Sequence, residues 1–214
     1  PLVGSVLIPG VNQSDNASDT LALVLLAAVL AIAIAIPLGI WAARNDRVSA
    51  VVRPVLDFMQ TMPAFVYLIP TVVIFLTGPV PGIIATIVFA MAPGVRFTEL
   101  GIRQVDKEVV EAGQAFGSTP GRILRQIQLP LALPTIMAGV NQVIMLSLSM
   151  VVIAGMVGAG GLGEDVVAAL QRVDVALGFE AGLAVVILAM FLDRVTSALG
   201  DRAPVARALA AARV

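Results

Sequence analysis

Five long runs of apolar residues set what this chain of 214 residues can fold into. They cover residues 20–43, 51–76, 83–101, 131–157 and 182–199. A helix needs about 20 apolar residues to cross the hydrocarbon core of a bilayer, and each run is close to that length or longer. Only 13% of the residues are charged, against about a quarter in soluble domains. The sequence therefore predicts an all-α membrane protein with five spans.

Basic residues gather on one side of these spans. That side carries Arg44, Arg47, Arg53, Arg103, Lys107, Arg122, Arg125, Arg194, Arg202, Arg207 and Arg213. On the other side Arg172 stands among the acidic residues Asp15, Asp19, Glu164, Asp165, Asp174 and Glu180. Cytoplasmic loops are the ones enriched in Lys and Arg. We therefore expect a multi-pass protein of the cell (inner or cytoplasmic) membrane, with segment 102–129 and tail 203–214 cytoplasmic and residues 1–19 extracytoplasmic.

Missing residue types narrow the chemistry. The chain has no histidine and no cysteine, which removes His-based triads, thiol nucleophiles, disulfides and the usual zinc sites. The one lysine, Lys107, lies in no Gly-x-x-x-x-Gly-Lys-[Ser/Thr] phosphate loop. A net charge of −1 offers no basic surface for nucleic acid. We expect no catalytic residue, no metal and no cofactor, so the chain is not predicted to be an enzyme.

The polar segment 102–129 has the pattern of two short helices. Val105, Val109, Ala112 and Phe116 recur at helical spacing, and Gly117 is typical of a helix C-terminus. Thr119 is a predicted N-cap with Pro120 at the first helical position, and Pro130 is expected to end the second helix before the fourth span. An ordinary solvated loop is the alternative, but 28 residues with their own caps favour a docking surface.

The same segment carries a motif. Glu111, Ala112 and Gly113 are followed by Gly117 and then by Ile127, Gln128, Leu129 and Pro130. This resembles the Glu-Ala-Ala signature of ABC importer permeases, with Gly113 in place of the second Ala. The resemblance implies a five-span ABC importer permease core (MetI-like) whose cytoplasmic coupling helix docks on a separate ATPase. The coupling residues it implies are Glu111, Ala112, Gly113, Gly117, Ser118, Pro120 and Arg122.

Several further stretches resemble the glycine betaine/proline betaine (osmoprotectant) permeases. They are residues 37–41, 59–67, 129–142 and 146–163. The resemblance implies a binding-protein-dependent importer built from two copies of this chain, two copies of an ATPase that binds the ATP, and an extracytoplasmic binding protein. The alternatives are a permease for methionine or another small amino acid and, in a different class, an ATP-independent secondary transporter or channel. Betaine permeases commonly carry further N-terminal segments, and residues 1–19 are either a truncation or a short natural N-terminus.

A glycine-rich stretch follows the fourth apolar run. Gly158, Gly160, Gly161 and Gly163 fit Gly-x-Gly-x-x-Gly, the dinucleotide-binding fingerprint. That fingerprint needs a short preceding strand, whereas a run of spanning length precedes it here. We expect a flexible, tightly turning outer loop that contacts the binding protein or gates the pathway.

Polar residues inside the apolar runs are candidates for a translocation pathway. They are Thr61 and Tyr67 in the second run and Asn141 and Ser149 in the fourth, and Pro63 and Met145 are candidates with them because they lie beside these residues. Polar groups at membrane depth face a cavity or hydrogen-bond a neighbouring helix, and both readings stay open. Asp57 and Glu99 are expected to form structural ion pairs with Arg53, Arg96 or Arg103, and Asp193 with Arg194. With one Trp and one Tyr, the chain is not expected to build an aromatic cage for a quaternary ammonium alone.

Overall fold

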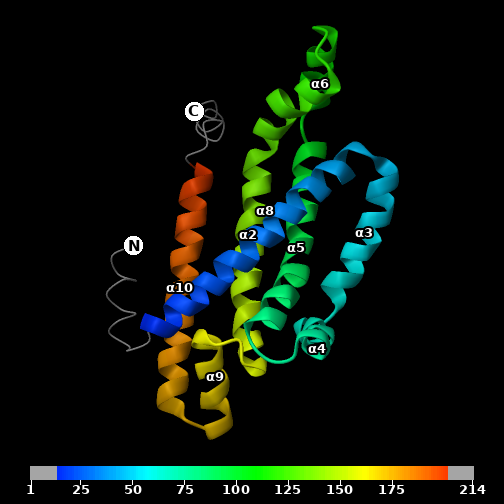
Figure 1. Cartoon of the computed structure of the whole chain (residues 1–214). Helices are drawn as coiled ribbons and strands as arrows, with labels where there is room; N and C mark the ends of the chain where they lie inside the picture. Colours follow the sequence, from blue (N-terminus) through cyan, green and yellow to red (C-terminus); the bar gives the residue numbers. More distant parts are fainter. Residues whose placement is uncertain (1–13, 202–214) are drawn as a thin grey trace.

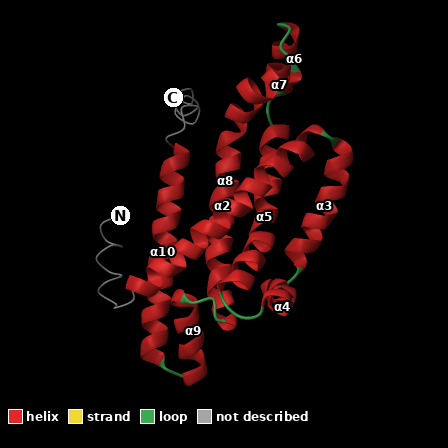
Figure 2. Ribbon diagram, viewed as in Figure 1, coloured by secondary structure: helices red, strands yellow, loops and turns green. Residues whose placement is uncertain are grey.

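The described part of the chain, residues 14–201 of this computed structural model, is helical throughout and contains no strand (Figure 2). The predicted all-α class is confirmed. The expectations for residues 1–13 and for the tail from Arg202 onward lie outside the described residues.

The helices follow one another with short connections. In chain order they are α2 (Ser14–Arg44), α3 (Asp46–Thr61), α4 (Ala64–Phe75), α5 (Pro79–Arg103), α6 (Lys107–Ala115), α7 (Pro120–Ile123), the π-helix η1 (Leu124–Gln128), α8 (Leu129–Ala154), the 3₁₀ turn η2 (Gly155–Val157), α9 (Gly161–Arg172) and α10 (Val175–Asp201). Within residues 14–201, four helical stretches are long and apolar enough to cross a membrane, and a fifth joins them if α3 and α4 count as one bent span. The four are α2, α5, α10 and the stretch that contains α8.

The second apolar run is broken where we expected one membrane segment. Helices α3 and α4 meet at an angle of 95°. Met62 and Pro63 have ψ angles of 134° and 143°, so both leave the helical conformation between α3 and α4. A residue before proline is pushed out of the α region, and proline has no N–H to continue the ladder. Helix α3 is roughly 24 Å long and α4 roughly 18 Å, so neither helix alone reaches across the ~30 Å hydrocarbon core.

Helix α5 lies at the centre of the bundle and has its most extensive contacts with α2 and α8. Small residues allow this close approach. A Cβ at Gly94 would lie 2.8 Å from the Cβ of Ala35 on α2, and one at Gly139 would lie 2.5 Å from the Cβ of Phe97. Small residues at helix contacts are typical of membrane bundles, where dispersion contacts replace the hydrophobic effect as the driving force.

The molecule has two distinct ends (Figure 1). The end that carries α6, here called the α6 end, also holds the α2–α3 elbow and the last turns of α10. The opposite end, the α9 end, holds α4, α9 and the turn between α8 and α9. The helix ends with most of the basic residues, such as Arg44 and Arg103, belong to the α6 end, while Arg172 terminates α9.

Candidate functional site

The segment predicted to couple the chain to an ATPase projects from the bundle (Figure 1). Helix α6 has no buried residue. The expected apolar stripe is therefore uncovered: the side chain of Phe116, directly after α6, is 91% exposed, and Val109 is exposed as well. A helical turn that leaves its apolar side uncovered is suited to contact with another protein.

The turn after α6 has the predicted geometry. Gly117 has φ +76°, the left-handed conformation that terminates helices, and the Ser118 N–H donates to the Gly113 carbonyl at 3.1 Å. Thr119 precedes α7 and Pro120 opens it, although the Thr119 hydroxyl makes no capping hydrogen bond. The positions of the helix end and the helix start are confirmed.

The motif residues around this turn have different surroundings. Glu111 is exposed and borders an open cleft together with Lys107, Gln114 and Gln128. Ala112 and Arg122 are exposed on α6 and α7. Gly113 is half-buried, and a Cβ there would lie 2.8 Å from Cδ1 of Ile127. The small residue at 113 thus lets α6 lie close to the helix that leads into α8.

The expectation that Pro130 ends the second short helix is wrong. Helix α7 continues through η1 into α8, so that residues 120–157 form one helical stretch. The Leu129 N–H donates to the Leu124 carbonyl, five residues back, and Pro130 then occupies the first turn of α8. Within this continuous stretch, the π-helical turn η1 directly before Pro130 interrupts the α-helical hydrogen-bond pattern where the N–H of proline is missing. The segment at the α6 end is therefore continuous with a long apolar helix.

The glycine-rich stretch at the α9 end is tightly packed where we expected a flexible loop. It does turn sharply, with positive φ at Gly158, Gly160 and Gly161. A Cβ at Gly155 would lie 2.2 Å from the carbonyl carbon of Gly163, so the two backbones touch. Because α8 and not a strand precedes the stretch, the dinucleotide-binding alternative is wrong.

Helix α2 holds the start of α9 in place. The Leu162 N–H donates to Thr20 Oγ1 at 2.8 Å, and the Asn16 amide donates to the Asp165 carboxylate. Thr20 is buried, and its hydroxyl satisfies one of the N–H groups that a helix N-terminus leaves without a partner. No local sequence pattern predicts this cap, because Thr20 and Leu162 are 142 positions apart.

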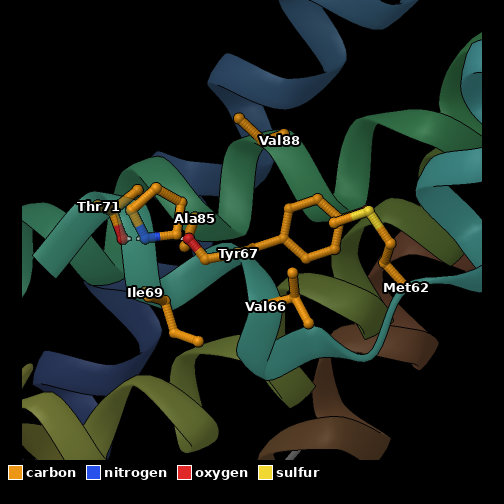
Figure 3. Close-up of a pocket in the computed structure, with 8 residues that line it drawn as sticks. Met62, Val66, Tyr67, Ile69, Thr71, Ala85 and Val88 are labelled. Carbon is orange, nitrogen blue, oxygen red and sulfur yellow. Dashed lines mark hydrogen bonds between the residues drawn. The ribbon is translucent and has the colours of Figure 1, made fainter. Parts of the chain in front are cut away.

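The pathway candidates of the second run gather at the bend between α3 and α4. Tyr67 is buried, and its hydroxyl donates to the Met59 carbonyl. Its ring is tilted against the ring of Phe89, with the two ring centroids 5.5 Å apart. Thr61 and Pro63 are exposed at the bend. Figure 3 shows the ring of Tyr67 along an apolar groove that Met62, Val66, Ile69, Ala85 and Val88 also line.

The pathway candidates of α8 do not form one lining. The side-chain amide of Asn141 donates to Oδ1 of Asp193 on α10 at 2.9 Å. Of the two alternatives, this residue therefore takes the hydrogen bond to a neighbouring helix. Met145 is half-buried, and Ser149 is exposed with its hydroxyl bonded to the Met145 carbonyl. Asp193 thus pairs with Asn141, and the described residues show no ion pair between Asp193 and Arg194.

The other two ion-pair predictions are confirmed. Asp57 pairs with Arg96, and Glu99 pairs with both Arg53 and Arg103. Sequence reasoning missed Ser49 as a further donor to Glu99. The i, i+4 spacing of Glu99 and Arg103 on one helix was the available signal for their contact.

Comparison with known proteins extends these observations. The family model described as binding-protein-dependent transport system inner membrane component matches residues 35–203. The chain is 54% identical over 202 residues to the glycine betaine/carnitine transport permease protein GbuB of Listeria monocytogenes, covering 94% of the chain and 72% of that protein. It is 51% identical to the glycine betaine transport system permease protein OpuAB of Bacillus subtilis, covering 91% of the chain and 69% of that protein. For the glycine betaine/proline betaine transport system permease protein ProW of Escherichia coli K12, the identity is also 51%, covering 93% of the chain and 56% of that protein.

Solved structures share the fold at lower identity. An inward-facing structure of the MetNI methionine ABC transporter superposes with a TM-score of 0.77 at 23% identity, covering 85% of this chain and 91% of the other. A crystal structure of an amino acid ABC transporter with histidines superposes with a TM-score of 0.69 at 17% identity, covering 91% of this chain and 97% of the other. At this identity the likeness concerns the fold alone.

Proposed function

The chain belongs to the family of inner membrane components of binding-protein-dependent transport systems, and on this premise we propose that it is the permease subunit of an ATP-driven importer of glycine betaine and related betaines. The observation that carries the proposal is an identity above one half to permeases named for glycine betaine, across more than nine-tenths of the chain. The chain spans 56–72% of the length of these relatives. The activity is therefore proposed for the helical core that the two share.

Hydrolysis of ATP is assigned to a separate subunit. The chain has no phosphate-binding loop, and the exposed face of α6 with Phe116 supplies a surface on which such a subunit docks. Two copies of the ATPase and two copies of this chain make up the proposed assembly. Closure of the ATPase pair on ATP moves α6, and the continuous helix from α7 to α8 carries that movement into the bundle.

Substrate selection is assigned to a separate extracytoplasmic binding protein. A quaternary ammonium is held well by several aromatic faces. Here the one tryptophan, Trp41, is 60% exposed on the last turn of α2, and the hydroxyl of the one tyrosine is already bonded to the backbone. A chain with so few aromatic side chains is suited to passing a betaine onward after weak contact. The packed glycine-rich turn and α9 form the surface that we propose for the binding protein.

The test is uptake of radiolabelled glycine betaine into proteoliposomes that contain this chain, its ATPase and its binding protein. Uptake is expected with ATP and not with ADP, and an excess of carnitine or proline betaine should compete for it. Competition by unlabelled methionine alone would move the chain to the amino-acid alternative. Uptake at the same rate without ATP would contradict the importer proposal itself.

A further inference from the structure

One buried carboxylate joins α5 to α3 at the α6 end. The side chain of Glu99 is 3% exposed, and its Oε1 atom accepts hydrogen bonds from Ser49 and Arg53 and forms an ion pair with Arg103. Ser49 Oγ lies at 2.6 Å, Arg53 Nη2 at 2.8 Å and Arg103 Nε at 3.0 Å. A charge so far from water is stable only when it is paired and hydrogen-bonded, as this one is.

Arg103 extends this network to the α2–α3 elbow. Its Nη2 donates to the Ala42 carbonyl at 2.9 Å and to Oδ1 of Asp46 at 2.8 Å. Arg103 is the last residue of α5, and the N-cap of α6 is Asp106, three residues later. The network therefore lies directly at the root of the segment that projects from the bundle.

Apart from this network, α3 is attached to the bundle by the Asp57–Arg96 ion pair and by the buried Leu56, which belongs to one apolar cluster with residues of α2 and α5. Only Ser49 and Leu56 are buried on it, and Val51, Val55 and Phe58 are exposed. An open cleft of about 360 Å³ separates α3 from α5, lined by Arg53, Asp57, Arg96, Glu99 and Leu100. Long charged side chains bridge this cleft beside the apolar cluster around Leu56. A charged bridge between two helices couples the position of one to that of the other.

We propose that Glu99 is the positioning residue that carries movement of α6 to α3 and, through the bend at Met62–Pro63, to α4. The inference rests on the proposed function, and it assigns to the Glu99–Arg53–Arg103 cluster a role beyond holding the fold. Displacement of the end of α5 moves Arg103 and Glu99 together, since both lie on one helix. Arg53 then draws α3 with them, because releasing it would leave the Glu99 carboxylate underpaired while still buried.

The experiment compares Arg53→Gln with Arg47→Gln in the complete transporter, reconstituted into proteoliposomes with its ATPase and binding protein. Both residues are exposed arginines of α3, but Arg47 forms no ion pair within the described residues and serves as the matched control. Arg53→Gln leaves the Glu99–Arg103 pair intact within α5, so the variant is expected to fold. ATP hydrolysis and glycine betaine uptake are measured in the same vesicles, and their ratio gives the ATP used per molecule imported.

We expect Arg53→Gln to raise this ratio about five- to tenfold, within the range of coupling between distant sites, and Arg47→Gln to leave it unchanged. Glu99→Gln should raise it further, and Glu99→Asp, which keeps the charge, should restore part of the wild-type ratio. A wild-type ratio in Arg53→Gln overturns the proposal. So does a loss of hydrolysis and uptake in equal proportion in assembled complexes, which is the signature of a purely structural pair. Failure of the wild-type transporter to import betaine with ATP would instead contradict the proposed function, and with it this inference.

Discussion

Gly117 and Gly121 lie four residues apart, and a side chain at either position would meet open space. They differ in backbone conformation: Gly117 has φ +76°, whereas Gly121 lies in α7. A left-handed conformation costs L-residues about 1–2 kcal/mol, so a substitution at 117 is strained even where there is room for it. Glycine is therefore favoured at position 117 only by its left-handed backbone conformation, and nothing favours glycine at position 121.

This contrast gives a prediction at the residue scale. Gly117→Val should abolish transport while the protein still inserts into the membrane, because the turn between α6 and α7 would change its direction. Gly117→Asn should keep part of the activity, since Asn tolerates the left-handed region. Gly121→Val should change transport by no more than about twofold, as an exposed substitution does. Uptake and membrane content measured for all three variants would test this, and normal transport by Gly117→Val would contradict a coupling role for the turn.

At the scale of the element, hydropathy predicted the long helices but not which proline would break one. Pro54 and Pro70 lie inside α3 and α4 without ending them, and Pro93 lies inside α5. Only Pro63 coincides with the 95° bend. A proline kinks or breaks a helix according to whether neighbouring groups satisfy the freed carbonyls, and those neighbours come from elsewhere in the chain. The expectation that Pro130 ends a helix is wrong for a related reason. The π-helical turn η1, which lets the helix continue past Pro130, has no recognisable pattern in the sequence.

The contact between α8 and α9 gives a prediction at this scale. Gly155→Ala should destabilise the protein by about 1–3 kcal/mol or more. The new Cβ would overlap the backbone of Gly163, and a backbone cannot rotate out of the way as a flexible side chain can. The control is Gly182→Ala on α10, where a Cβ meets nothing within 4 Å. That variant should be neutral or stabilised by up to about 1 kcal/mol. Thermal unfolding of both purified variants in detergent measures the difference, and equal midpoints would show that α9 has room to move away from α8.

At the scale of the whole molecule, the distribution of charge anticipated the two ends. Among the described residues, the helix ends with Arg44 and Arg103 lie at the α6 end, and α9, which ends at Arg172, lies at the other. The Ser49 contact of Glu99 and the Asp193 contact of Asn141 were harder to predict, because each joins residues about 50 positions apart with several rotamers open to each. Within the candidate site, the turn between α6 and α7 could be predicted from Gly117 and Pro120. The interhelical hydrogen bonds of uncharged side chains, such as those of Ser49 and Asn141, could be identified only from the fold.

The absence of cysteine from the chain allows a direct test of orientation. Gln114→Cys on α6 and Gln171→Cys on α9 replace two exposed glutamines at opposite ends. In intact cells a membrane-impermeant maleimide should label position 171 and not 114, because positive charge marks the α6 end as cytoplasmic. Both positions should react after permeabilisation, which controls for accessibility. Labelling of position 114 in intact cells would reverse the predicted topology.

The buried carboxylate of Glu99 also has a consequence for the order of synthesis. A ribosome releases the chain from its N-terminus, so Ser49 and Arg53 on α3 emerge before Glu99, and Arg103 follows within one helical turn. The cationic partner on α3 has thus been synthesised before α5 enters the bilayer. Of the two counter-ions of the carboxylate, Arg103 alone is made after it. A circular permutation that placed α3 after α5 would lose this advantage while preserving every contact of the finished protein.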